Sequence, residues 1–153
     1  MADMTDSELK VFINAVTHYF TLLTRTPARI RTVYLANGAM PLFEYTGLIT
    51  VAGRYHGCVY FSTSGDALRA LLVEFREPDR QEANLLDAVG EIANTIAGNA
   101  RKHFGKDLEI SVPVTIRGVP EKIKSAVRTR PFAIHLEWSS HDAVVIIDLA
   151  VAR

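Results

Sequence analysis

Several features of exported and membrane-embedded proteins are missing from this sequence. Cys58 is the only cysteine, which excludes an internal disulfide and fits a reducing compartment. No apolar run approaches the length of a membrane span, and the N-terminus carries acidic residues where a signal peptide carries positive charge. We therefore expect a cytoplasmic protein that is neither exported nor embedded in a membrane.

An excess of charge of either sign is also missing. Lysine plus arginine and aspartate plus glutamate number 17 each, so no global field would attract nucleic acid or an anionic membrane. Four basic residues lie between Gly118 and Pro131, namely Lys122, Lys124, Arg128 and Arg130. Without interleaved aromatic side chains they are a poor case for nucleic-acid binding, and they form either a solvated loop or a contact to an acidic protein surface.

The spacing of metal ligands is absent as well. The histidines show no paired-ligand pattern, so we expect no bound metal and no cofactor of the chain's own. They are His18, His56, His103, His135 and His141. Cys58 lies inside a predicted strand, where we expect it to behave as a small buried apolar side chain, with a reactive thiol as the remote alternative.

The features that are present predict one domain over 1–153, with a composition typical of globular proteins. Capping boxes at Thr5 with Glu8 and at Asp79 with Glu82 predict the starts of two helices. The predicted helices span 6–25, 65–77 and 82–104. Alternating apolar residues predict strands within 31–63, where there are three, and over 108–116, 134–138 and 143–151.

This order of elements predicts an α+β fold of two layers. About six strands form a largely antiparallel sheet, and the three helices cover it. Each half of the chain pairs a long helix with three strands, which favours an internal pseudo-duplication. The last strand, from Ala143 to Val151, is apolar on both faces and is expected inside the sheet or at a contact between chains.

The helix predicted over 82–104 carries a defined apolar stripe. On a helical wheel this stripe fills little more than a quadrant, which must face the core. Its members are Leu85, Val89, Ile92, Ala93, Ile96 and Ala100. Gly90 and Gly98 also lie in the helix interior, where glycine is costly, so they invite an explanation from packing or docking.

A polar strip lies opposite the apolar stripe and consists of Asp87, Glu91, Asn94 and Gly98. Glu91 and Asn94 are three positions apart, so their side chains are neighbours that can enter one cleft of a partner together. On spacing alone, such a pair is usually only solvated surface. Gly98 and Gly90 would let another backbone come close to the helix.

Residues 86–100, together with residues 108–113, form a longer sequence pattern that contains Glu91 and Asn94. The pattern resembles the signature of CheX in the CheC/CheX/FliY phosphatase family, and the order of elements is similar to CheX over nearly the whole chain. In that family an acidic residue, a glutamate and an asparagine lie on one helix, with a proline in the next strand. The matching residues here are Asp87, Glu91, Asn94 and Pro113.

The CheC branch of this family carries a second copy of the motif on its first helix. Here Glu8 is followed three positions later by Val11, so we expect a single site, as in CheX. CheX-like proteins also pair, which implies a symmetric homodimer in which the strip with Glu91 and Asn94 stays outside the contact.

The resemblance implies a phosphatase that hydrolyses the phospho-aspartate of a CheY-type response regulator, in chemotaxis or another two-component pathway. It implies that Asn94 holds a water in line with the phosphorus, while Glu91 pairs with the regulator's active-site lysine and the regulator supplies Mg²⁺. Asp87 would be either a contact at the rim of the partner or only a surface charge, while Gly90 and Gly98 would lie against the partner's backbone. The alternative is a regulator-binding or scaffold module of the same fold without catalysis.

Overall fold

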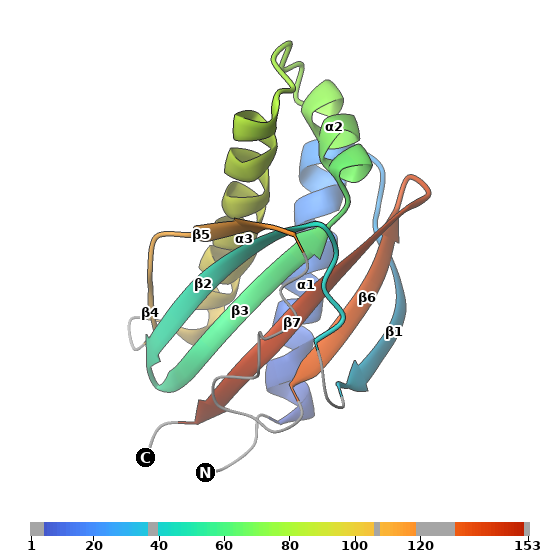
Figure 1. The fold of residues 1–153 in the computed structure, drawn as a ribbon. Helices are drawn as coiled ribbons and strands as arrows, with labels where there is room; N and C mark the ends of the chain where they lie inside the picture. The colour runs from blue at the N-terminus through green and yellow to red at the C-terminus, as the bar shows by residue number, and fades with distance from the viewer. Residues whose placement is uncertain (1–4, 37–39, 106–107, 119–130, 152–153) are drawn as a thin grey trace.

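The computed structural model (Figure 1) describes residues 5–36, 40–105, 108–118 and 131–151. Their helices and strands, in chain order, are α1 (Asp6–Thr24), β1 (Arg29–Leu35), β2 (Tyr45–Gly53), β3 (Tyr55–Thr63), α2 (Gly65–Glu74), α3 (Glu82–Phe104), β4 (Leu108–Ile110), β5 (Val114–Arg117), β6 (Phe132–Trp138) and β7 (His141–Val151). Within this part of the chain, every helix is too short or too polar to cross a membrane.

The strands form one antiparallel sheet in the order β1-β6-β7-β3-β2-β4, and β5 pairs with β2 beyond the end of β4. Helices α1 and α3 lie against the same face of this sheet (Figure 1). The predicted α+β fold with three helices is confirmed. The sheet has seven strands rather than about six.

The additional strand arises because the alternating run over 108–116 is interrupted. β4 and β5 pair with different parts of β2, and residues 111–113 between them belong to neither strand. In this link, the Ser111 hydroxyl accepts a hydrogen bond from the backbone N–H of Thr50 at 2.9 Å. Pro113 has no N–H to donate to a ladder, so the strand predicted there is divided in two.

The topology has the internal symmetry that the sequence predicted. Exchanging β1 with β4 and β5, β2 with β6, and β3 with β7 maps the strand order onto itself. The same exchange relates α1 to α3, which end at Thr24 and Phe104. Aligning the helices at these ends places Phe12 and Val16 opposite Ile92 and Ile96, and all four side chains are buried.

The main core fills the space between the sheet and the helices. Phe20 of α1 packs against Phe61 and Trp138 of the sheet, with ring centroids 6.3 Å and 5.9 Å away. Burying aromatic side chains of this size contributes roughly 1.5–3 kcal/mol each to folding. The indole N–H of Trp138 donates to the Thr24 hydroxyl at 2.9 Å, which satisfies a buried polar group.

The start of α3 differs from its prediction. The capping box at Thr5 and Glu8 is confirmed for α1, but α3 begins after Gln81, which makes no side-chain cap. The Asp79 carboxylate instead accepts from the backbone N–H of Gln81 at 3.1 Å. Asp79 therefore shapes the turn before the helix, because aspartate competes for nearby backbone donors.

Helix α2 is also shorter than predicted. It ends at Glu74 rather than at residue 77, and Arg76 adopts a left-handed φ of 58°. The N–H of Glu77 donates to the carbonyl of Leu72 at 2.9 Å, which closes the final turn before Pro78.

Strand β7 lies inside the sheet, between β6 and β3, as its two apolar faces predicted. One face contributes Val145, Ile147 and Leu149 to the main core. The other face contributes Val144 and Ile146 to a smaller cluster with Met40, Tyr60 and Ala133. Both faces are covered, so β7 needs no second chain to bury it.

Candidate functional site

Helix α3 lies directly against strand β2 because one side chain is missing. A Cβ atom at Gly47 would lie 2.5 Å from the carbonyl oxygen of Val89 and 3.0 Å from the Cβ of Ala93. Glycine alone permits so close an approach of helix and sheet. This contact between Gly47 and α3 was not predicted from the sequence, because a lone glycine in a strand indicates a close approach but does not identify the element that approaches.

The predicted orientation of α3 is confirmed. All six members of its apolar stripe are buried, namely Leu85, Val89, Ile92, Ala93, Ile96 and Ala100. On the outer side, Asp87 and Glu91 are exposed, and Asn94 and Gly98 are half-buried. The strip predicted from the helical wheel therefore reaches the surface.

Glu91 and Asn94 lie side by side on this strip without partners of their own. Within the described ranges, neither side chain forms a hydrogen bond or an ion pair, and the Thr95 hydroxyl donates to the main-chain carbonyl of Glu91 rather than to its carboxylate. A Cβ added at Gly98, one turn beyond Asn94, would meet no atom within 4 Å. A carboxylate and an amide thus face outward beside open space.

Gly90 serves a contact within the chain. It is buried, and an added Cβ would lie 2.8 Å from a methyl carbon of Thr115 and 3.4 Å from the Cβ of Pro113. The expectation that Gly90 gives a partner's backbone access to the helix is therefore wrong. Pro113, the proline of the family pattern, lies in the link before β5 and packs on α3 next to Glu91.

A recess of about 230 Å³ adjoins Glu91 and Asp87. Its lining includes the aromatic and aliphatic side chains of Tyr19, Leu72 and Phe75, and Glu77 adds a third carboxylate. Burial raises the pKa of the Tyr19 hydroxyl above its usual value, and the nearby Glu91 carboxylate raises it further. Tyr19 thus stays neutral beside Glu91. Its burial could have been predicted from the sequence, because it lies three positions after Val16 on the same face of α1.

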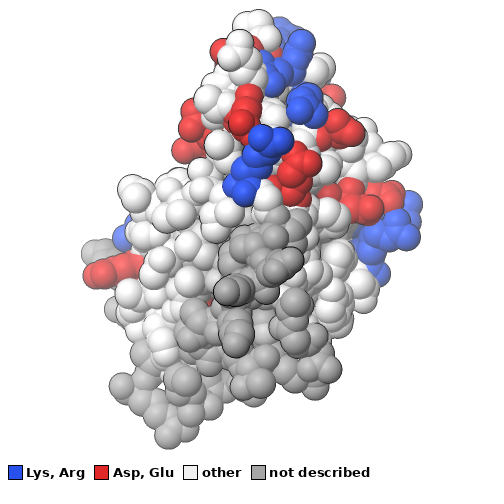
Figure 2. Space-filling view, viewed as in Figure 1, with Lys and Arg blue, Asp and Glu red and all other residues white. Residues whose placement is uncertain are grey.

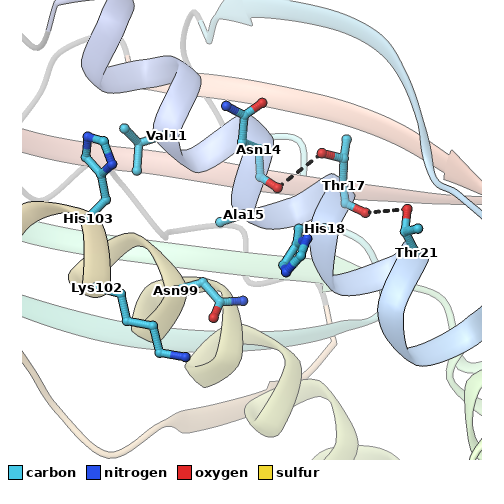
Figure 3. A pocket seen from close by; sticks show the side chains of 9 residues that line it. All are labelled: Val11, Asn14, Ala15, Thr17, His18, Thr21, Asn99, Lys102 and His103. Carbon is cyan, nitrogen blue, oxygen red and sulfur yellow. Dashed lines mark hydrogen bonds between the residues drawn. The ribbon is translucent and has the colours of Figure 1, made fainter.

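Two further hollows flank the strip on the side of the helix C-terminus. One, of about 550 Å³, is lined by Asn94, Gly98, Asn99 and Lys102 among others. The other, of about 650 Å³, lies between α1 and α3 and is shown in Figure 3. We call it the α1/α3 hollow, and its polar side chains include Asn14 and His18 from α1 and Asn99, Lys102 and His103 from α3. Asn99 and Lys102 line both hollows.

The remaining candidates from the sequence do not assemble into a second site. Within the described ranges, no three side chains of His, Cys, Asp or Glu come together as metal ligands would. His135 stacks on Tyr34, and His141 stacks on Trp138. Cys58 is half-buried in β3, and burial raises the pKa of its thiol.

The charged surface of the face seen in Figure 2 is mixed. Basic and acidic side chains are interspersed at the end of the molecule where α2 and the start of α3 lie (Figure 2). This mixture agrees with the balanced composition and gives the face seen in Figure 2 no field of one sign at this end. The basic residues Lys122, Lys124, Arg128 and Arg130 lie outside the described residues.

Comparisons with solved structures identify the fold. A putative chemotaxis protein from Desulfovibrio vulgaris Hildenborough has a TM-score of 0.81 at 21% identity, covering 94% of this chain and 97% of that chain. CheX from Desulfovibrio desulfuricans has a TM-score of 0.80 at 18% identity, covering 95% and 99%. A chain of the CheX–CheY–BeF₃–Mg²⁺ complex from Borrelia burgdorferi has a TM-score of 0.69 at 16% identity, covering 93% and 97%.

Comparison with sequence families leads to the same group. Curated protein sequences give no match. A family model described as "Chemotaxis phosphatase CheX" matches residues 45–137, a segment that holds all of α3 and the Glu91–Asn94 pair. This match covers more than half of the 153 residues, and the protein therefore belongs to the CheX family.

Proposed function

We propose that this chain hydrolyses the phospho-aspartate of a CheY-type response regulator. The observation that carries the proposal is the pair of exposed Glu91 and half-buried Asn94 on the outer side of α3, without partners in the described part of the chain and inside the segment that matches the family. A structural relative is a chain of a complex that contains CheX and CheY, which supports docking of such a regulator on this fold.

Hydrolysis of an acyl phosphate suits so sparse a site. Phosphoryl transfer requires mainly positioning and charge stabilisation, and the regulator would bring both Mg²⁺ and the phosphorylated aspartate. The amide of Asn94 can accept a hydrogen bond from a water and donate one to a phosphoryl oxygen. The water attacks phosphorus as the bond to the aspartate oxygen breaks and one water proton passes to a phosphoryl oxygen, which releases dihydrogen phosphate and a free carboxylate. A neutral amide takes up no proton, so Asn94 orients the water.

Glu91 would serve docking rather than bond breaking. Its carboxylate is exposed and unpaired among the described residues, and a charge-assisted contact to the regulator's lysine would fix the helix over the phosphorylated aspartate. Asp87 lies one turn earlier and adds a second carboxylate at the rim of this contact. Gly98 leaves the space beside Asn94 open to the regulator's backbone, and the covered Gly90 takes no part.

The direct test uses CheY-type regulators of the same organism, phosphorylated with acetyl phosphate and freed of excess reagent. The proposal predicts that substoichiometric amounts of the chain accelerate the loss of the phospho-aspartate over several turnovers. A regulator that binds the chain without any acceleration would contradict the proposal. That result would indicate the regulator-binding or scaffold module instead.

We further propose that the chain forms a symmetric homodimer through its free sheet edge. β1 pairs only with β6 among the described strands, and Val33, Tyr34 and Leu35 on it are each at least 36% exposed. A strand with unpaired backbone groups and exposed apolar side chains is a ready contact for a second copy. β1 and α3 lie toward opposite edges of the sheet (Figure 1), so this contact leaves Asn94 free.

We also propose that the chain forms one domain and is located in the cytoplasm. Each half of the chain contributes an edge of the sheet that pairs with the other half, β1 with β6 and β4 with β2. Neither half completes the sheet alone, which supports a single domain over 1–153. Response regulators act in the cytoplasm, so the proposed substrate locates the chain there.

A further inference from the structure

The outer surface of α3 changes its charge along its length. Near the helix N-terminus, the recess beside Glu91 is lined by Glu77, Asp87 and Glu91 and by no basic residue. Near the C-terminus, the α1/α3 hollow is lined by Lys102 and two histidines and by no carboxylate. Asn94 lies between these two regions. A partner seated on Asn94 therefore meets opposite charges on its two sides.

The charge at the C-terminal end is available to a partner. Lys102 is exposed and forms no ion pair within the part of the chain that the structure describes. In Figure 3, His18 and Asn99 point into the same space between the helices, and Lys102 borders it. The hollow of about 650 Å³ is large enough for several side chains of a docked segment.

This hollow is continuous with the surface around Asn94. Asn99 and Lys102 line the α1/α3 hollow and also line the hollow that contains Asn94 and Gly98. One partner can therefore occupy both hollows. A protein that reaches Asn94 from outside extends naturally over Lys102.

The internal symmetry of the fold also indicates that the α1/α3 hollow suits an anionic contact. Aligning α1 and α3 at their ends, Thr24 and Phe104, places Asn14 opposite Asn94 and Val11 opposite Glu91. Asn14 and Val11 both line the α1/α3 hollow. The symmetric counterpart of the Glu91–Asn94 pair thus keeps an amide, lacks the carboxylate and lies beside a lysine, so it suits an anionic contact where Glu91 suits a cationic one.

We propose that the α1/α3 hollow is the second half of the docking surface and holds a carboxylate-bearing segment of the response regulator, with Lys102 as the charged contact. The identity of the partner rests on the proposed function. Contacts of two signs fix orientation, because Glu91 meets a cation at one end while Lys102 meets an anion at the other. A regulator docked in the reverse direction would face like charges at both ends.

The test measures binding of a regulator held in its active form by beryllofluoride and Mg²⁺, so it requires no turnover. Lys102→Glu is expected to raise Kd about tenfold at low salt, and Lys102→Ala less, since reversal replaces attraction by repulsion. The difference should shrink as salt screens the contact. In turnover assays, KM should rise while kcat stays unchanged. The matched control is Arg69→Glu on α2, an exposed charge reversal outside both hollows, which should leave Kd unchanged.

Thermal melting verifies that each variant is folded, which the exposure of Lys102 predicts. An unchanged or lower Kd for Lys102→Glu, with unchanged salt dependence, would overturn the inference even if the wild-type chain dephosphorylates the regulator. Absence of turnover by the wild-type chain would refute the proposed function instead. Because binding is read separately, the two failures are distinguishable.

Discussion

Substituting Gly98 by alanine should stabilise the fold and impair the function. Gly98 lies inside α3, and an added Cβ would meet no atom within 4 Å, so the methyl group fits without repacking. Replacing a helix-interior glycine by alanine contributes roughly 0.5–1 kcal/mol, because alanine loses less backbone entropy on folding. For a chain of this size, that gain raises Tm by about 1–4 °C.

The same methyl group projects into the space that we assign to the regulator. We therefore expect Gly98→Ala to raise KM for the phosphorylated regulator although the protein melts at a higher temperature. A matched substitution on the same helix is Gly90→Ala, where the helix gain is offset by overlap with Thr115 at 2.8 Å, which costs about 1–3 kcal/mol. Gly90→Ala should thus melt no higher than the wild type.

Calorimetry on these two variants tests the expected changes in Tm, and steady-state kinetics tests the expected rise in KM. A Gly98→Ala protein that is less stable than the wild type would show that the outer face of α3 is packed rather than open. A stabilised variant with unchanged KM would show that the regulator does not approach the helix at Gly98. Either result would refute the assigned docking face.

Three further substitutions test the scaffold that positions α3, and one measurement tests the proposed dimer. Gly47→Ala should destabilise the protein by at least about 1–3 kcal/mol in denaturant titrations, because its Cβ would overlap the backbone of Val89. Ile96→Asp should abolish cooperative unfolding, because a buried unpaired carboxylate is costly; a cooperatively melting variant would contradict the burial of Ile96. Thr24→Val should cost about 1–3 kcal/mol by leaving the Trp138 indole N–H without its acceptor. Light scattering at micromolar concentration should give the mass of a dimer, and a monomer mass would refute the proposed β1 contact.

Local patterns in the sequence were sufficient to predict the elements and the orientation of α3. Its apolar residues repeat at helical spacing, so burial of Ile92 and Ile96 and exposure of Glu91 follow from periodicity alone. The buried position of β7 likewise followed from its two apolar faces. These features depend on residues close in sequence, which is why they could be predicted.

The features that were missed depend on contacts between distant segments. The alternating run over 108–116 predicted one strand, but the tertiary position of Ser111 and Pro113 divides it, and the same link covers Gly90. The α1/α3 hollow requires two helices that are far apart in the chain. Helical or strand periodicity cannot predict which distant segments pack together, because the sheet topology determines these contacts.

The proposed phosphatase activity depends above all on Asn94, so the decisive measurement is the turnover of Asn94→Ala, with Gln81→Ala as a matched control. Gln81 precedes the same helix, is exposed and makes no side-chain cap, so its loss should leave kcat unchanged. Asn94→Ala should bind the beryllofluoride-activated regulator with nearly the wild-type Kd, yet dephosphorylate the phosphorylated regulator slower by orders of magnitude, because the attacking water is no longer oriented. Wild-type turnover by a folded Asn94→Ala protein would contradict the account.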